Sequence, residues 1–161
     1  MNRGIFLLLG SNQGHPSAML AEAAERIGKE TGRIVARSDV YRSAAWGMQD
    51  QPDFYNQVLQ TESPLDADDL LKKLLAIERA MGRVRAEKWG PRIIDIDILF
   101  YGEQVVNTSS LTVPHPGIAD RKFTLLPLSQ IAPDLVHPVL KKTIATLLRE
   151  CPDPLDVNRQ P

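Results

Sequence analysis

The sequence predicts an α+β fold, a ferredoxin-like antiparallel sheet with packed helices and additions at its C-terminal end. Two observations carry this prediction. The expected elements follow the order β-α-β-β-α-β, and the 161 residues contain no internal repeat, low-complexity segment or linker. One domain spanning residues 1–161 is therefore expected, since domains commonly hold roughly 100–150 residues.

The first three elements are predicted from apolar runs between glycine stops. Residues 5–9 form an apolar run too short for a helix before Gly10, and so predict a buried strand. Apolar residues at helical spacing, with Pro16 at the entry, predict a helix over 17–29. Residues 33–43 alternate loosely, which favours a second strand after Gly32.

The second half of this element order is predicted in the same way. Residues 54–61 predict a strand, and Asp66 is placed to cap a helix whose apolar row ends at Gly82. A basic loop leads to a strand over 93–101, and Val105-Val106 is expected to pair back on it as a hairpin. A proline-rich stretch follows, with a last helix around 143–150.

Composition narrows the class of function. The formal net charge is −1, which does not favour general nucleic-acid binding. The single cysteine allows no internal disulfide or zinc cluster and fits a reducing compartment. No stretch approaches the ~20 apolar residues of a membrane span, and the N-terminus lacks a signal-peptide pattern, so a cytoplasmic monomer is the expectation.

Two carboxylates in one strand are the most informative feature. Asp95 and Asp97 point the same way along a strand, with Cα atoms ~6.6 Å apart. Carboxylates this close repel one another unless a cation or water lies between them. Mg²⁺ binds through one or two carboxylates plus substrate phosphates. The alternative is a solvated face, and Ile94, Ile96, Ile98 and Phe100 are expected to line the opposite, core face.

A dense basic loop precedes the carboxylates. Its cations, set against Glu87 alone, are Arg79, Arg83, Arg85, Lys88 and Arg92. Guanidinium groups bind phosphate oxygens bidentately, so cations beside a metal site suggest a polyphosphate ligand, with Trp89 stacking on a base or covering the site. A loop of solvated charges is the alternative. The chain has neither a P-loop nor a protein-kinase motif set.

Aromatic residues suggest a second ligand. Phe54 and Phe123, with Asn56 nearby, suit a flat heterocycle. Its faces would stack on the two rings, and the Asn56 amide would form hydrogen bonds with its polar edge. From the sequence alone, the alternative is a place in the core, where such rings are found more often. Two prolines restrict His115, which is either structural or part of the site.

The chain resembles the 6-hydroxymethyl-7,8-dihydropterin pyrophosphokinase family over roughly residues 4–136. The motifs that carry the resemblance stand in family order: Gly10-Ser11-Asn12, Tyr41-Arg42-Ser43, Gln51-Pro52-Asp53-Phe54-Tyr55-Asn56, Gly82-Arg83-Val84-Arg85, Trp89-Gly90-Pro91-Arg92-Ile93-Ile94-Asp95-Ile96-Asp97, and Pro114-His115-Pro116 leading to Arg121 and Phe123. The resemblance implies transfer of the diphosphate of ATP to the hydroxymethyl group of the pterin, a step of folate biosynthesis.

The resemblance also implies residue roles. Asp95 and Asp97 would hold two Mg²⁺ ions, while Arg83 and Arg92 would stabilise the transferring diphosphate. The residues implied around ATP are Glu78, Arg85, Lys88, Trp89, Ile98, Thr112, His115 and Arg121. Those implied around the pterin are Ser43, Ala44, Trp46, Phe54, Asn56 and Phe123.

The chain departs from the family pattern at one three-residue run and at three single positions. Ser43-Ala44-Ala45 replaces a Thr-Pro-Pro-like run, and Phe54 stands where Tyr is common. Lys88 replaces Arg and Ser110 replaces a basic residue, which weakens two expected phosphate contacts.

Two other interpretations of the residues stay open: a metal-dependent nucleotidyl- or glycosyltransferase built on the Asp-x-Asp, and a ferredoxin-like RNA-binding module that uses the basic loop.

Overall fold

The computed structural model describes residues 1–44, 51–82 and 93–161. Its strands are β1 (Asn2–Ser11), β2 (Arg33–Arg37), β3 (Tyr41–Ser43), β4 (Phe54–Ser63), β5 (Asp95–Tyr101), β6 (Val106–Asn107), β7 (Thr112–Val113) and β8 (Val157–Arg159). Its helices are α1 (Pro16–Glu30), α2 (Ala67–Ala80), α3 (Lys122–Ile131), α4 (Ile144–Glu150) and a short 3₁₀ turn, η1 (Ile118–Asp120). None of the helices in these ranges has the length and apolar character needed to cross a membrane.

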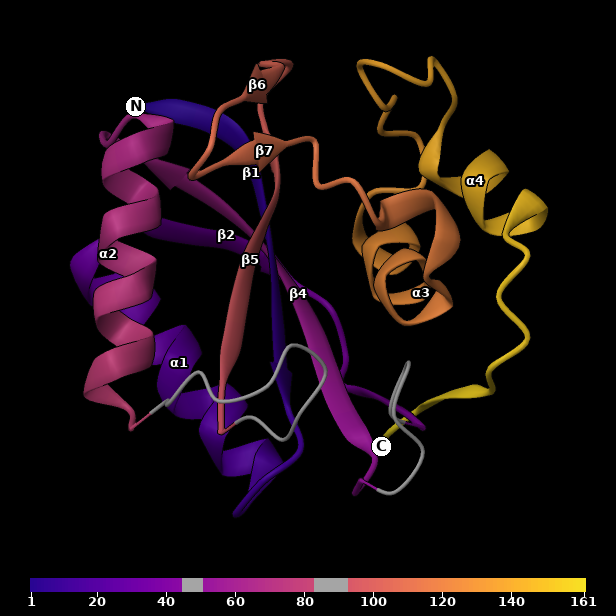
Figure 1. The fold of residues 1–161 in the computed structure, drawn as a ribbon, viewed down its shortest axis with the longest axis horizontal. Coiled ribbons are helices and arrows are strands. Elements are labelled where there is room, and N and C mark those ends of the chain that lie inside the picture. Colours follow the sequence, from indigo (N-terminus) through magenta and orange to yellow (C-terminus); the bar gives the residue numbers. More distant parts are fainter. Residues whose placement is uncertain (45–50, 83–92) are drawn as a thin grey trace.

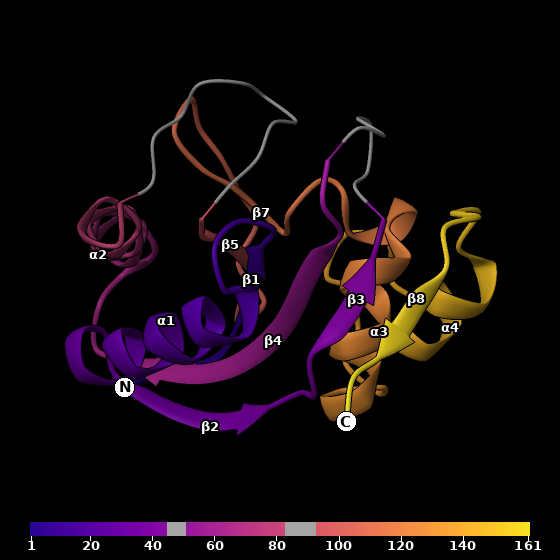
Figure 2. The same ribbon diagram turned by 90° about the horizontal axis from the view of Figure 1, so that it is seen from below.

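The main sheet is antiparallel in every described pairing. Its order is β5-β1-β4-β3-β8, and β2 pairs with β4 beside β3. Helices α1 and α2 cover one face of the sheet, and α3 and α4 cover the other (Figures 1 and 2). The chain is therefore a mixed α/β structure with an antiparallel sheet and covered faces.

The covered faces explain the continuous apolar run in β1. Ile5, Leu7 and Leu9 pack into the core under α1 and α2. Phe6 and Leu8 pack into the second core, under α3 and α4. A strand buried on both sides needs apolar residues at every position, so it reads as a run without alternation.

The helix signals in the sequence are confirmed. Pro16 is the first residue of α1, and Asp66 caps α2 by accepting a hydrogen bond from the Asp69 N–H at 2.8 Å. Gly82 follows α2 with a φ of 92°, a left-handed conformation that glycine adopts at little steric cost. The last helix begins after Thr143, whose side chain caps it.

Three strand predictions need correction. The strand expected over 33–43 divides into β2 and β3, because Ser38 leaves the strand and its hydroxyl accepts from the Val58 N–H. Strand β5 begins at Asp95, two residues later than expected. Val106 pairs with Val113 in the separate β6-β7 hairpin, so Val105-Val106 does not return to β5.

Phe100 also lies on the face opposite to the one expected. The pairing of β1 with β5 shifts between Leu7↔Ile98 and Phe6↔Phe100, which places one extra residue, Leu99, in β5. Such a β-bulge changes the face of every side chain beyond it. Ile94, Ile96 and Ile98 therefore belong to the core under α1 and α2, whereas Phe100 packs under α3 and α4.

Candidate active site

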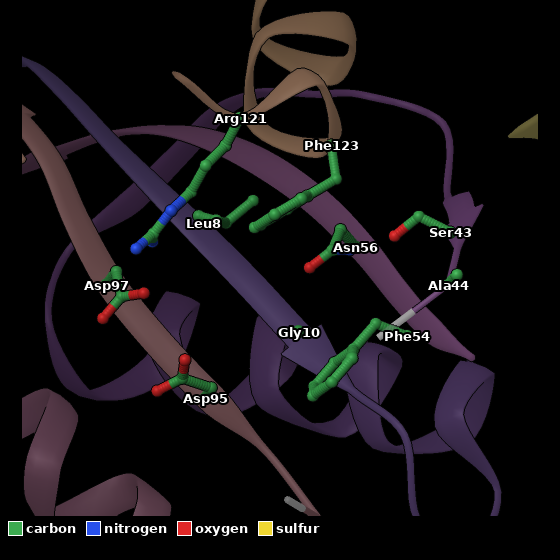
Figure 3. Close-up of a pocket in the computed structure, with 10 residues that line it drawn as sticks. All are labelled: Leu8, Gly10, Ser43, Ala44, Phe54, Asn56, Asp95, Asp97, Arg121 and Phe123. Carbon is green, nitrogen blue, oxygen red and sulfur yellow. The ribbon is translucent and has the colours of Figure 1, made fainter. Parts of the chain in front are cut away.

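A pocket opens on the α3 side of the sheet, with about 560 Å³ of empty space including its open mouth. Its floor is formed by β1, β4 and β5, and its walls by the end of β3 and the start of α3 (Figure 3). The residues that line it are Leu8, Gly10, Ser43, Ala44, Phe54, Asn56, Asp95, Asp97, Arg121 and Phe123. Eight of these were predicted as site residues from the sequence.

The two carboxylates occupy one side of the pocket. Asp95 and Asp97 lie on the same face of β5 and are directed toward the pocket, as Figure 3 shows. Both are partly exposed, while Ile96 between them is buried in the core. The alternation predicted for this strand is confirmed up to the bulge at Leu99.

The pair fits the ligand set of a substrate-bridged magnesium ion. Within the described residues no group of three or more His, Cys, Asp or Glu side chains is arranged to hold a metal. Mg²⁺ does not require such a cage, because it binds through one or two carboxylates and completes its shell with waters and substrate phosphates. Asp95 and Asp97 line the pocket and are carboxylates of the kind that this mode of binding uses.

Two aromatic rings and two buried polar groups occupy the other side. Phe54 and Phe123 are partly exposed and line the pocket, so neither is an enclosed core residue. Ser43 Oγ and Asn56 Nδ2 are buried and have no hydrogen-bond partner among the described residues. Buried polar groups are nearly always paired, so these two suggest a ligand with a hydrogen-bonding edge.

Gly10 makes room for Asn56. A Cβ atom on Gly10 would lie 2.8 Å from Asn56 Oδ1, closer than van der Waals contact allows. Gly10 and Leu8 were not predicted as site residues. The alternation of β1 places both on the same face, so Gly10 in the Gly-Ser-Asn motif was the signal from which Leu8 could also have been inferred.

Arg121 extends from the start of α3 toward Asp97 (Figure 3). Its guanidinium carbon lies 6.0 Å from the centre of the Phe123 ring, within the range of a cation–π contact. The backbone of Gly117 lies against it, and a Cβ there would come within 2.6 Å of the guanidinium carbon. Arg121 therefore adds positive charge beside the carboxylate pair.

His115 is held as a neutral imidazole. Burial, followed by the charge of Arg121, lowers its pKa to about 4, although Asp95 acts in the opposite direction. Its Nδ1 accepts a hydrogen bond from the Gly117 N–H at 3.1 Å, so at pH 7 the proton resides on Nε2. His115 can thus donate one hydrogen bond without carrying charge.

His115 and three further predicted residues lie outside the pocket lining. Glu78 is buried, and its carboxylate accepts from the Ile96 N–H at 2.7 Å, which ties α2 to the strand that carries both aspartates. The Ile98 side chain is in the core, and Thr112 is exposed on β7. Their part in nucleotide binding stays a prediction. Trp46, Arg83, Arg85, Lys88, Trp89 and Arg92 lie outside the described residues.

Comparison with known proteins identifies relatives. Residues 6–133 match the family described as 7,8-dihydro-6-hydroxymethylpterin-pyrophosphokinase. Two proteins called 2-amino-4-hydroxy-6-hydroxymethyldihydropteridine pyrophosphokinase are similar to this chain. The one from Methylorubrum extorquens is 47% identical over 81% of this chain and 84% of its own length. The one from Aquifex aeolicus is 41% identical over 87% of this chain and 87% of its own length.

Longer proteins also match. The folic acid synthesis protein fol1 of Pneumocystis carinii is 38% identical over 94% of this chain, which spans 20% of that protein. A crystal structure of an HPPK-DHPS in complex with substrates has a TM-score of 0.73 at 15% identity. Wild-type HPPK-DHPS of Plasmodium falciparum has a TM-score of 0.74 at 16% identity. This chain spans 43% and 45% of these two chains, and at such identities the likeness shows the fold alone.

Proposed function

The chain belongs to the 7,8-dihydro-6-hydroxymethylpterin-pyrophosphokinase family, and from this premise we propose how its pocket performs the family's reaction. That reaction transfers the diphosphate of ATP to the hydroxymethyl oxygen of the dihydropterin in folate synthesis. A bond forms between that oxygen and the β-phosphorus, the bond from the β-phosphorus to the α,β-bridging oxygen breaks, and AMP leaves.

The pterin binds between Phe54 and Phe123 in this proposal. A flat bicyclic ring offers two faces for stacking and an edge of donors and acceptors. Ser43 Oγ and Asn56 Nδ2, buried without partners among the described residues, are the groups that would meet that edge. This pairing of aromatic rings with unpartnered polar atoms, beside a carboxylate pair, is the observation that carries the proposal.

Asp95 and Asp97 would hold the magnesium that accompanies ATP, two ions being expected from the family resemblance. When bound, the metal neutralises phosphate charge and orients the reacting oxygens. The residues of the chain supply the rest. Arg121 adds positive charge beside the carboxylates, and neutral His115 offers one hydrogen-bond donor.

The basic loop completes the proposed site. Arg83 and Arg92 would stabilise charge on the transferring diphosphate, while Arg85, Lys88 and Trp89 would enclose ATP together with Glu78, Ile98 and Thr112. Trp46 and Ala44 would present backbone groups to the pterin. Phosphoryl transfers of this kind depend on positioning and charge neutralisation more than on covalent chemistry, so no general base is assigned.

The remaining sequence-based expectations are part of this proposal. The ferredoxin-like arrangement is supported by the β5-β1-β4 order with α1 and α2 on one face. A single domain, a monomeric state and a cytoplasmic location remain predictions, as does the absence of nucleic-acid and membrane partners.

The test is to incubate the protein with ATP, Mg²⁺ and 6-hydroxymethyl-7,8-dihydropterin and to separate the nucleotide products. We expect AMP and the diphosphorylated pterin in equal amounts, and neither product when the pterin is omitted or Mg²⁺ is removed by a chelator. Release of inorganic pyrophosphate with transfer of AMP would indicate a nucleotidyltransferase instead. An RNA-binding module would produce no AMP at all.

A further inference from the structure

The C-terminal segment, residues 151–161, touches both walls of the pocket. It lies beyond residues 6–133, the part matched by the family model. In Figure 2 its strand β8 runs beside β3, on the side where α3 and α4 pack. Neither α3 nor β8 was predicted from the sequence, so this arrangement emerges only from the structure.

The first contact supports the wall formed by Ser43 and Ala44. Strand β8 pairs antiparallel with β3 over its whole length, and Val157 stands opposite Ser43. Beyond the strand, the Gln160 N–H donates to the Val40 carbonyl at 2.8 Å. On its other side β3 pairs with β4, where Ser43 stands opposite Phe54. Strand β3 is therefore held on both edges, and β8 supplies the outer one.

The second contact supports the wall formed by Arg121 and Phe123. Asp153 is buried, and its Oδ2 accepts a hydrogen bond from the Lys122 N–H at 3.1 Å. Lys122 is the first residue of α3, whose N-cap residue Arg121 makes no capping hydrogen bond with its own side chain. Asp153 thus provides the cap from 31 residues away, and its charge favours the positive end of the helix.

Within the segment, the same aspartate is itself fixed. Asp153 Oδ1 accepts from the Leu155 N–H at 3.0 Å, two residues before β8 begins. One carboxylate therefore joins the start of α3 to the strand that supports β3. At the far end of α3, Gln130 accepts from the Asp39 N–H and the Tyr41 hydroxyl, each at 2.9 Å. The two links hold α3 and β3 at a fixed separation.

We infer that residues 153–158 are a positioning element for the substrate, which sets the distance between the wall formed by Ser43 and Ala44 and the wall formed by Arg121 and Phe123. This inference rests on the proposed function, since it takes the pterin as the occupant. Asp153 touches no substrate. It acts through Arg121 and Phe123, which flank the N–H that it binds.

Proline substitutions at neighbouring positions of β8 give a matched test. Because Gln160 donates to Val40, the alternation of an antiparallel pair directs the Asn158 N–H toward Arg42 and the Arg159 N–H away from β3. Asn158→Pro removes a ladder hydrogen bond, whereas Arg159→Pro leaves the ladder intact. The Arg159–Asp39 ion pair lost in the control is exposed and contributes little.

The readouts are the Kd for 6-hydroxymethylpterin by fluorescence titration, the Kd for a non-hydrolysable ATP analogue, and the melting temperature. We expect Asn158→Pro to weaken pterin binding about tenfold, the order expected for one lost hydrogen bond. The Kd for the ATP analogue should change less than about twofold. The kcat at saturating pterin should stay at the wild-type value. Arg159→Pro should match the wild type in all three.

Asp153 variants test the other wall. Asp153→Ala should weaken pterin binding about as much as Asn158→Pro, and Asp153→Asn should lie between, because its single oxygen can serve one of the two N–H groups. Glu150→Ala, which breaks the exposed Lys142–Glu150 ion pair nearby, is the control and should bind like the wild type. If Asp153→Ala does not fold, the Asn variant and the proline pair still decide the question.

The outcomes separate the inference from the function beneath it. A wild-type protein that binds no pterin would refute the proposed function. A wild type that binds pterin, with Asn158→Pro and Asp153→Asn binding it equally well, would overturn the positioning role alone. Equal losses for pterin and ATP analogue, accompanied by a large fall in melting temperature, would show that the segment is only structural.

Discussion

At the residue scale, the site is defined by two buried polar groups that lack a hydrogen-bond partner among the described residues. Ser43 Oγ and Asn56 Nδ2 are buried and unpaired within the described part of the chain. An unsatisfied buried group costs about 1–3 kcal/mol, and a ligand that supplies the missing partners recovers that cost on binding. The sequence could identify Ser43 and Asn56 through their motifs, but not their lack of partners, which depends on the packing of β1, β3 and β4.

Phe123 should contribute to pterin binding by stacking. Phe123→Ala is expected to weaken the pterin complex by ~1–3 kcal/mol, the range measured for base–aromatic stacking, and to affect ATP binding much less. Calorimetric titration with each ligand measures both effects. Because the ring is only partly buried, the melting temperature should fall modestly. Equal losses for the two ligands with a large drop in stability would assign Phe123 to the core.

Gly10 should control the position of the Asn56 side chain. Gly10→Ala places a Cβ at 2.8 Å from Asn56 Oδ1, so the amide must move and pterin affinity should fall by about tenfold, the equivalent of one hydrogen bond. Gly28→Ala in α1 is the control, since its Cβ would meet Ile34 at an ordinary 3.6 Å. That variant should gain roughly 0.5–1 kcal/mol of stability and bind pterin normally.

Removal of either carboxylate should abolish turnover without unfolding the protein. Asp95→Ala and Asp97→Ala are expected to lower kcat by orders of magnitude, because each would lose a ligand of the proposed magnesium site. Without metal, the loss of like-charge repulsion should leave stability unchanged or raised. Steady-state AMP production and thermal melts with a chelator measure the two effects. Asp134→Ala, an exposed carboxylate outside the pocket, is the control, and near-wild-type turnover of either site variant would contradict the metal role.

At the element scale, local signals predicted the first half of the chain better than the second. Caps, glycine stops and apolar periodicity gave β1, α1, β4 and α2, because these elements carry their own end signals. Helix α3 was missed because it contains Pro127 and lacks a local cap, its N-terminal N–H being bound by Asp153. The bulge at Leu99 was missed because only the pairing with β1 reveals it.

The cap of α2 offers a quantitative check on these local signals. Asp66→Ala removes the side chain that accepts from the Asp69 N–H and should lower the free energy of unfolding by about 0.5–2 kcal/mol. Asp68→Ala, an exposed residue in the first turn that does not serve as the cap, should cost less. Urea denaturation of both variants measures the difference. Equal effects would mean that helix-dipole charge, and not the capping bond, stabilises this end.

At the scale of the whole molecule, the sheet gathers residues that are far apart in the sequence. Gly10, Phe54, Asp95 and Phe123 meet in one pocket because β1 lies between β4 and β5, and α3 packs over that face. The β-α-β-β-α-β order predicted the central pairing. It could not predict the outer strand β8, because a three-residue strand at the end of the chain has no periodic signal and forms only against the edge of β3.

The buried His137 and the half-buried His115 should make the molecule less stable in weak acid. Burial lowers the pKa of His137, and burial together with Arg121 lowers that of His115 to about 4, compared with 6.5 in an unfolded chain. Above pH 6.5 neither state binds these protons. As the pH falls below 6.5 the unfolded state binds more protons, so stability declines, and for His115 the decline continues to about pH 4.

His137→Asn tests this linkage away from the pocket. The Nδ1 of His137 accepts hydrogen bonds from the Val139 and Leu140 N–H groups at 3.2 and 3.0 Å. An asparagine oxygen can accept from the same direction but does not titrate. Chemical denaturation with a chelator present measures the free energy of unfolding of each protein at pH 7.5 and at pH 5. Between these two pH values, the wild type should lose more stability than the variant. Parallel losses would mean that His137 does not contribute and that the acid sensitivity comes from groups that both proteins share, His115 and the carboxylates.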